Sequence, residues 1–171
     1  MNYTPFYQSH LDSNGKVVDF GGWALPVNYG SQIKEHEQVR NDAGMFDVSH
    51  MVVTDIHGVD AKAFFRHLIS NDVAKLDKFG IGKALYSGLL NREAGVIDDL
   101  IVYLMPFGYR LVTNAATEAK DLNWIKQVAA NFKVELFPRR DLAMLAVQGP
   151  NAIKKVIAAH PHMKDKLEQL K

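Results

Sequence analysis

Two adjacent carboxylates stand at the start of an otherwise apolar run, GVIDDLIVY at residues 95–103. This placement is unfavourable unless each carboxylate finds a hydrogen-bond donor or a cation. Because successive side chains on a strand point to opposite faces, Asp98 and Asp99 are not expected to share a proton as an acidic dyad does. One of them should face the core or a cleft, where burial or a donor sets its ionisation. Taken alone, the pattern favours the simpler interpretation, in which the carboxylate only caps a turn.

A second segment, AGMFDVSHM at residues 43–51, mixes apolar, acidic, hydroxyl and imidazole groups. Such variety is unusual for a simple linker. The pattern favours a buried crossing in which the carboxylate of Asp47 and the hydroxyl of Ser49 satisfy backbone donors. The apolar residues expected to pack there are Met45, Phe46 and Val48.

Neither a metal site nor a phosphate loop is predicted. Four of the seven histidines are spread over separate elements without metal-ligand spacing. These four are His36, His50, His57 and His67. The closest pair, His160 and His162, lies in a terminal stretch that we expect to be solvated. The run Gly80-Ile81-Gly82-Lys83 is not followed by Ser or Thr, so a flexible connection is favoured over a phosphate loop.

Composition excludes several classes of function. The 171 residues are 47% hydrophobic and 23% charged, which is ordinary for a globular domain. Twenty Lys and Arg against 19 Asp and Glu leave a net charge of +1, without the basic footprint of a nucleic-acid partner. The absence of cysteine removes disulfides, thiolate nucleophiles and Cys-type zinc sites. No apolar run spans a membrane and no targeting sequence is recognised, so a cytoplasmic protein without a membrane partner is the default expectation.

The elements that position these residues follow from hydrophobic period and turn residues. Residues 1–30 are rich in turn formers and are predicted to be irregular with short strands. Ser31 is predicted to cap a helix that runs to about Asp42 and stops at Gly44. From Met51 onward, the pattern predicts an alternation of strands and helices. The predicted elements are a strand at 52–56, a helix opened by 58–60, a connection at 75–82, strands at 84–90, 96–105 and 109–114, a helix capped by Thr117, strands at 134–137 and 141–147, and a terminal helix after Pro150.

This β-α-β-β-β-α-β-β-α order predicts an α+β fold. We expect antiparallel sheets with helices packed on one face, related to the β-α-β units of ferredoxin-like folds. The terminal helix, with Ile153, Val156, Ile157 and Met163 in period, continues over 164–171 without a stop residue or a following strand. We therefore expect the chain to be a fragment of a longer protein.

Eight short segments, in one order, resemble the aminomethyltransferases (T-proteins) of the glycine cleavage system over about residues 3–150. One such segment would carry little weight, whereas eight in family order are specific. They are DFGGWALP at 19–26, YGSQI at 29–33, VRNDAGMFDVSHM at 39–51, NDV at 71–73, ALYS at 84–87, GVIDDL at 95–100, VTNA at 112–115 and VQGP at 147–150.

The resemblance implies a reaction and a set of residues. The family transfers the aminomethyl group of the lipoylated H-protein to tetrahydrofolate, releasing ammonia and forming 5,10-methylenetetrahydrofolate. Asp98 matches the family's catalytic acid, which lies against the folate near N10. Met51 and Tyr86 match folate-binding positions that pack on the ring system, and Asn114 matches one that makes a polar contact. Each of these three could equally be an ordinary core residue.

The resemblance also divides the chain. Residues 1–50 match the N-terminal segment of the folate-binding domain, residues 51–139 an α+β subdomain carrying the catalytic Asp, and residues 140–171 a truncated return into the folate-binding domain. The family continues past residue 171, so we expect these 171 residues alone to have weak or no catalysis, because a half-formed pocket neither excludes water nor orients its ligand.

Three alternatives remain open. The same folate domain occurs in oxidases that demethylate sarcosine or dimethylglycine, and in a folate-binding protein that assists iron–sulfur enzymes. In a different class, the chain could be a non-catalytic module that binds folate or a carrier protein. In that reading, Lys75, Lys78 and Lys83 around a loop would meet an acidic partner.

Overall fold

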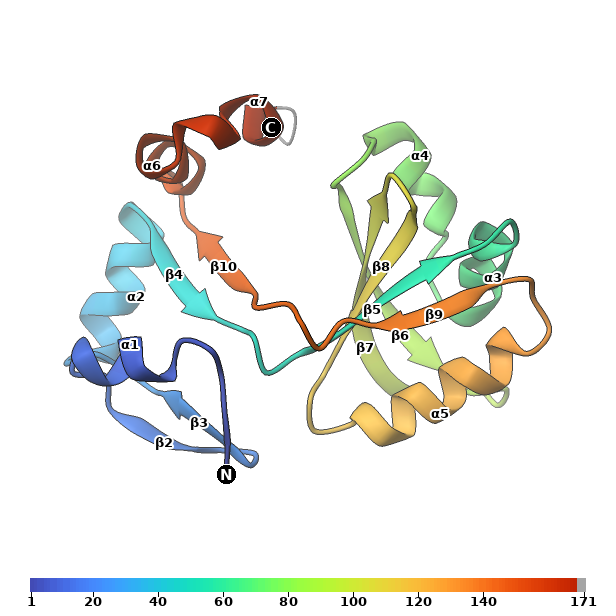
Figure 1. Cartoon of the computed structure of the whole chain (residues 1–171), viewed down its shortest axis with the longest axis horizontal. Helices are drawn as coiled ribbons and strands as arrows, with labels where there is room; N and C mark the ends of the chain where they lie inside the picture. Colours follow the sequence, from blue (N-terminus) through green and yellow to red (C-terminus); the bar gives the residue numbers. More distant parts are fainter. Residues whose placement is uncertain (169–171) are drawn as a thin grey trace. The chain divides into compact units, whose positions relative to one another are not determined.

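The computed structural model describes residues 1–168 and divides the chain into two compact units (Figure 1). The first unit combines Met1–His50 with the chain from Ala143 onward, and the second is Met51–Leu142. The chain therefore leaves the first unit once and returns to it once, and the second unit is an insertion in the first. No helix among residues 1–168 is long and apolar enough to cross a membrane.

The second unit is built on a five-stranded antiparallel sheet in the order β6-β7-β8-β5-β9. Because β8 and β9 both pair antiparallel with β5, they run parallel to each other, and α5 connects them as a split β-α-β unit. In contrast, β5 and β6 run in opposite directions, so the segment between them is not a second parallel crossover. The bounds are β5 (Val52–His57), β6 (Ala84–Leu90), β7 (Val96–Met105), β8 (Gly108–Thr113), α5 (Glu118–Ala129) and β9 (Glu135–Pro138).

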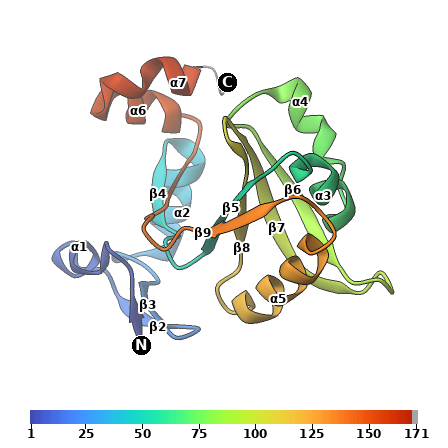
Figure 2. The ribbon, with the colours of Figure 1, turned by 45° about the vertical axis from the view of Figure 1, so that its right-hand side comes forward.

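Three helices, α3 (Ala61–Leu68), α4 (Leu76–Phe79) and α5, cover one face of this sheet (Figure 2). Alternating strand residues such as Leu100 and Val102 of β7 face these helices and belong to one apolar core. Phe64 and Phe65 of α3 are fully buried in the same core. The opposite face carries the other set of alternating residues and no helix of this unit, so the predicted α+β class with helices on one face is confirmed.

The first unit contains two small sheets. One has the order β1-β3-β2, and in the other β4 pairs antiparallel with β10. The bounds are β1 (Asn2–Tyr3), α1 (Tyr7–Asp12), β2 (Val17–Phe20), β3 (Trp23–Pro26), α2 (Gln32–Asn41), β4 (Gly44–Asp47), β10 (Leu145–Gln148), α6 (Ala152–Ala159), a 3-10 turn at Pro161–Met163 and α7 (Lys164–Glu168).

The helix predicted after Ser31 is present as α2, and the Ser31 hydroxyl accepts a hydrogen bond from the Lys34 backbone N–H at 3.3 Å. The stop predicted at Gly44 is wrong, because the helix ends at Asn41 and Gly44 begins β4. A Cβ on Gly44 would lie 2.3 Å from Val39 Cγ2, so a larger residue at this position would force the Val39 side chain to move.

Three further predictions of secondary structure need correction. The 1–30 segment contains a helix, α1, and the connection at 75–82 contains α4, whose Leu76 is fully buried. The terminal helix is interrupted at His160, where Pro161 starts a 3-10 turn. Its predicted continuation over residues 169–171 lies outside the described residues.

Candidate active site

The sequence-predicted site residues lie at one end of the second unit's sheet. Thr113 of β8 pairs with Leu100 of β7 and with Val52 of β5, and these are the last paired positions at this end of the three strands. One residue further on, Asp99, Asn114 and Met51 therefore occupy one row across the sheet end. The register places them with the face that carries no helix.

Asn114 joins the two adjacent carboxylates. Its side-chain Nδ2 donates hydrogen bonds to Asp98 Oδ1 at 2.9 Å and to Asp99 Oδ1 at 2.7 Å. The Tyr86 hydroxyl of the neighbouring strand β6 donates to Asp99 Oδ2. The Tyr86 ring remains 65% exposed, so this end of the sheet offers an open aromatic surface beside two carboxylates.

Asp98 and Asp99 have different surroundings. Asp98 pairs in register with Leu89 and accepts a hydrogen bond from the Thr117 hydroxyl at the start of α5, on the helix-covered face. Asp99 pairs with Gly88 and accepts from Tyr86, which belongs to the opposite set of strand residues. The prediction that the two acids face opposite sides of the strand is confirmed. Among residues 1–168, Asn114 alone has a side chain that donates to both.

The ionisation of this cluster follows from its donors. Burial opposes the charge on Asp98, but the hydrogen bonds from Thr117 and Asn114 and the interaction with the Asp121 carboxyl group outweigh burial and lower the pKa of Asp98 to about 2. The hydrogen bond to Asp99, followed by the charge of that carboxylate, raises the pKa of Tyr86. At neutral pH, Asp98 is therefore an acceptor and Tyr86 a neutral donor.

Sequence reasoning missed two residues of this cluster, Thr117 and Asp121. Thr117 was expected to cap α5, and it does occupy the N-cap position, but its hydroxyl makes no capping bond and reaches Asp98 instead. Asp121 lies on the buried stripe of α5 with Ile125 and Val128. An acid in phase with an apolar stripe is the feature that could have drawn attention to it.

Asp60, like Thr117, uses its side chain for a long-range hydrogen bond and not for a helix cap. It stands at the N-cap position of α3, yet its carboxylate accepts from the Lys133 backbone N–H at 2.8 Å and makes no capping bond.

Within residues 1–168, no group of three or more His, Asp or Glu side chains is arranged to hold a metal ion.

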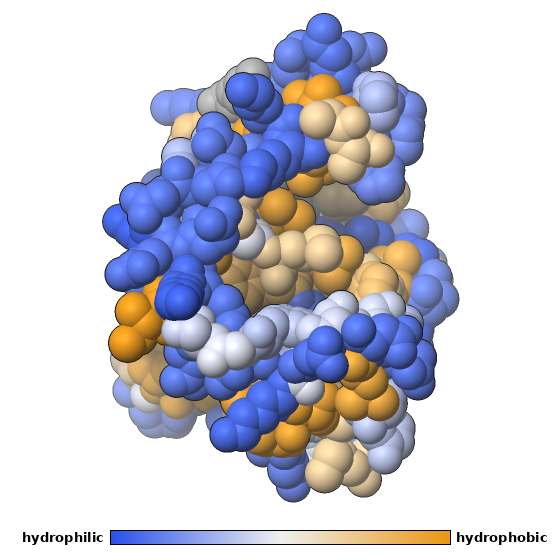
Figure 3. All heavy atoms as spheres, turned by 90° about the vertical axis from the view of Figure 1, so that its left-hand side faces the viewer, coloured by the Kyte–Doolittle hydropathy of each residue, from blue (hydrophilic) through white to orange (hydrophobic). Residues whose placement is uncertain are grey.

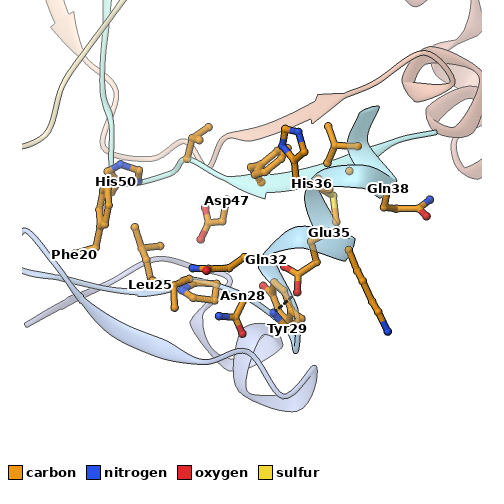
Figure 4. A pocket seen from close by; sticks show the side chains of 18 residues that line it. Phe20, Leu25, Asn28, Tyr29, Gln32, Glu35, His36, Gln38, Asp47 and His50 are labelled. Atoms are coloured by element: carbon orange, nitrogen blue, oxygen red, sulfur yellow. Dashed lines mark hydrogen bonds between the residues drawn. The ribbon is translucent and has the colours of Figure 1, made fainter. Parts of the chain in front are cut away.

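The first unit contains a cavity of about 950 Å³ lined by α2, β3 and β4 (Figure 4). Met45 and Phe46 of β4 line it and are 65% and 45% exposed, so the predicted packing of these two residues in a buried crossing is wrong. Figure 3 looks onto this side and shows hydrophobic atoms in a hollow bordered by hydrophilic ones. The Glu35 carboxylate accepts from the Tyr29 backbone N–H at 2.8 Å beside the cavity.

A polar network ties the strands and helix beside this cavity together. Asp47 accepts hydrogen bonds from the Thr4 hydroxyl at 2.5 Å and from the Ser49 backbone N–H at 2.9 Å, and its Oδ2 lies 3.0 Å from His10 Nε2. His10 Nδ1 lies 2.6 Å from the Tyr29 hydroxyl. The predicted role of Asp47 in satisfying a backbone donor is confirmed.

Ser49 also satisfies backbone groups, as predicted. Its hydroxyl accepts from the Met144 backbone N–H at 2.9 Å and donates to the Met144 carbonyl at 3.2 Å. Every one of these contacts lies within the first unit, where they connect α1, β4 and the segment before β10. We therefore assign this network a structural role, because it holds separate segments of the first unit together.

Comparison with known proteins decides the family. Residues 6–170 match the family described as the GCVT N-terminal domain. The chain belongs to this family. It is 58% identical over 168 residues to an aminomethyltransferase of Chromobacterium violaceum, and the match covers 98% of this chain and 46% of that protein. An aminomethyltransferase of Neisseria meningitidis is also 58% identical, over 171 residues, with the same two coverages.

A solved structure shares the fold of this GCVT-family chain. It is the glycine cleavage system aminomethyltransferase T from Bartonella henselae, with a TM-score of 0.83 and 33% sequence identity over 92% of this chain and 43% of that one. The resemblance to the glycine cleavage aminomethyltransferases drawn from the eight sequence segments is therefore confirmed. The chain spans a little less than half the length of these relatives.

Proposed function

We propose that this GCVT-family protein catalyses tetrahydrofolate-dependent aminomethyl transfer. In this proposal, the one-carbon unit on the lipoyl arm of H-protein passes to tetrahydrofolate, ammonia leaves, and 5,10-methylenetetrahydrofolate forms. Tetrahydrofolate is a co-substrate, lipoylated H-protein is the protein partner, and the cytoplasm is the location. The observation that carries the proposal is the cluster of Asp98, Asp99, Asn114 and Tyr86 at the open end of the sheet, in a family whose similar relatives are named aminomethyltransferases.

The role proposed for Asp98 is that of a charged acceptor near folate N10. Because its pKa is lowered to about 2, Asp98 is ionised at neutral pH and has no proton to give. It can accept a hydrogen bond or a proton from an N–H of the folate, which raises the electron density on that nitrogen for attack on the one-carbon unit. The hydrogen bonds from Thr117 and Asn114 hold the carboxylate in one orientation for this task.

Tyr86, Met51 and Asn114 are proposed to bind the folate. The exposed ring of Tyr86 and the thioether of Met51 suit a flat heterocycle, since both offer polarizable area. The Asn114 amide nitrogen donates to both carboxylates, which directs its carbonyl oxygen to a ligand N–H. These contacts fix the plane of the ring relative to the carboxylate pair.

Asp99 is the alternative for the catalytic carboxylate, because it shares the open face with Tyr86 whereas Asp98 reaches toward α5. The test compares Asp98→Asn and Asp99→Asn in the full-length polypeptide, with aminomethyl transfer from loaded H-protein as the readout. If Asp98 is the acceptor, Asp98→Asn lowers turnover by about 100-fold or more and Asp99→Asn by less. The reverse order assigns the role to Asp99, and full turnover by both variants contradicts the proposed function of this cluster.

A further inference from the structure

One buried acid in the second unit has no obvious means of carrying its charge. Asp121 lies in the first turn of α5 with 0% exposure, and neither of its carboxyl oxygens has a hydrogen-bond donor within the described part of the chain. An ionised carboxylate in such a position is strongly unfavourable unless it is paired. The side chain must therefore find a partner or keep its proton.

The partner at hand is a second acid. Both acids meet at Thr117, whose hydroxyl donates to Asp98 Oδ2 and whose backbone carbonyl accepts from the Asp121 N–H at 2.9 Å. The two carboxyl groups also affect each other: their interaction lowers the pKa of Asp98 and raises the pKa of Asp121. Two ionised carboxylates are acceptors only, so a hydrogen bond between them exists only when one of the two holds a proton. The charge of Asp98 also disfavours the doubly ionised state, as in other carboxyl pairs that share one proton.

The surroundings decide which acid holds the proton. Asp98 receives hydrogen bonds from Thr117 and Asn114, which stabilise its charged form, whereas the Asp121 oxygens have no donor within the described residues. Thr117 lowers the pKa of Asp121, but its hydroxyl donates to Asp98, and burial and Asp98 have larger effects. Burial, followed by the hydrogen bond and charge of Asp98, raises the pKa of Asp121 to about 6. Below about pH 6 the proton therefore resides on Asp121, and Asp98 keeps the charge.

The other charged groups around α5 do not cancel this effect. Lys120 favours the charged form of Asp121, but its ammonium group donates to the Ile97 carbonyl of β7 at 2.5 Å. On α3, which packs against α5, Arg66 pairs with Asp72 and the His67 ring lies against Phe132. Asp98 is the ionisable side chain with the largest effect on the pKa of Asp121.

We propose that Asp121 and Asp98 form a carboxyl–carboxylate pair with one proton, in which Asp121 donates to Asp98 and so holds it as a charged acceptor at the open end of the sheet. The meaning of this pair for catalysis rests on the proposed function, whereas the pair itself does not. Asp121 acts through Asp98 and is a positioning residue. It also couples the orientation of Asp98 to a proton that the reaction does not consume.

The direct test is a pH titration of the chain with ¹³C-labelled aspartate carboxyl groups, followed by NMR. Asp121 is expected to titrate near pH 6, and the Asp98 signal should shift at the same pH because the two groups share a hydrogen bond. In Asp98→Asn, the titration of Asp121 should move toward the ordinary aspartate range by about one pH unit or more. The exposed Asp77, which pairs with Lys62, provides the control Asp77→Asn, which should leave both titrations unchanged.

The proposal is overturned if wild-type Asp121 titrates in the ordinary range, or if Asp98→Asn leaves its titration unchanged. The wild-type titration suffices even if a variant does not fold. Enzyme assays separate this proposal from the proposed function. In the full-length polypeptide, Asp121→Asn, which still donates a hydrogen bond, should retain turnover and lose any step in the pH profile near 6, whereas Asp121→Ala should lower kcat. Absence of aminomethyl transfer in the wild type would overturn the proposed function and leave the NMR result intact.

Discussion

Each unit contains a polar cluster around a carboxyl group, and the two clusters differ in how many donors they contain. In the first unit, the Asp47 side chain is 2% exposed and is met by a hydroxyl, a backbone N–H and an imidazole. In the second unit, Asp98 has two side-chain donors and stands beside Asp121, whose oxygens have none. A carboxylate with a full set of donors stabilises a fold, whereas a pair of acids with too few donors must hold a proton.

The largest effect on stability is expected in the first unit. Asp47→Ala removes the common acceptor of Thr4, Ser49 and His10 and leaves buried donors without partners. We expect the free energy of unfolding to fall by about 3 kcal/mol, as measured by urea denaturation. Asp12→Ala, in which the lost contact is an exposed hydrogen bond from Gln8, is the control and should change stability by about 0.5 kcal/mol or less. Equal effects of the two changes would show that the Asp47 network does not stabilise the first unit.

The second prediction concerns pH. The pKa of Asp121 is raised from 3.8 to about 6 in the folded state, so folding takes up a proton between these values. The stabilisation by the protonated acid is complete below about pH 4 and is lost as the pH rises through 6, a change of about 3 kcal/mol. Asp121→Asn should remove this slope and leave the variant more stable than the wild type at pH 8.

Denaturation curves at several pH values between 4 and 8 measure the slope directly. A slope that persists in Asp121→Asn would mean that other groups cause it. Asp47 of the first unit should show the opposite pH dependence, because its pKa is lowered and its contribution to stability persists as the pH rises. Burial opposes the charge of Asp47, but its donors outweigh that effect.

A smaller effect is expected from the donor to Asp98. Thr117→Val keeps the shape of the side chain and removes the hydroxyl that Asp98 accepts from. We expect a loss of about 1–2 kcal/mol in the free energy of unfolding and a rise in the pKa of Asp98, since one donor to its charged form is gone. Thr117→Ser retains the hydroxyl and should restore both values. A Thr117→Val protein with unchanged stability and titration would show that Asn114 alone holds Asp98.

Local pattern predicted the strands around the site well. The alternation at 84–90 and 96–105 gave β6 and β7 with the bounds found in the structure, because each strand has one face in the apolar core. The short helices α1 and α4 were not predicted, since six and four residues carry too little period for a pattern. The division of the chain at residues 50 and 139 stays a prediction.

The site was only partly predictable for a different reason. Asp98, Tyr86 and Asn114 were assigned through the family resemblance, and their catalytic and folate-binding roles stay predictions, as does that of Met51. The Thr117 hydroxyl donates to Asp98, which lies 19 positions away in the sequence, and does not cap its own helix. Local propensity carries no information about such a contact, because capping and the long-range bond use the same hydroxyl.

The central claim is that Asp98 lies at a folate site formed by the open end of the sheet. Calorimetric titration of tetrahydrofolate into the full-length polypeptide and its Asp98→Asn variant tests it most directly, with Asp77→Asn as the matched control. We predict that the wild type and the control bind with equal affinity and that Asp98→Asn binds at least about 10-fold more weakly, the loss of one charge-assisted hydrogen bond. Equal affinity of all three proteins would contradict the account.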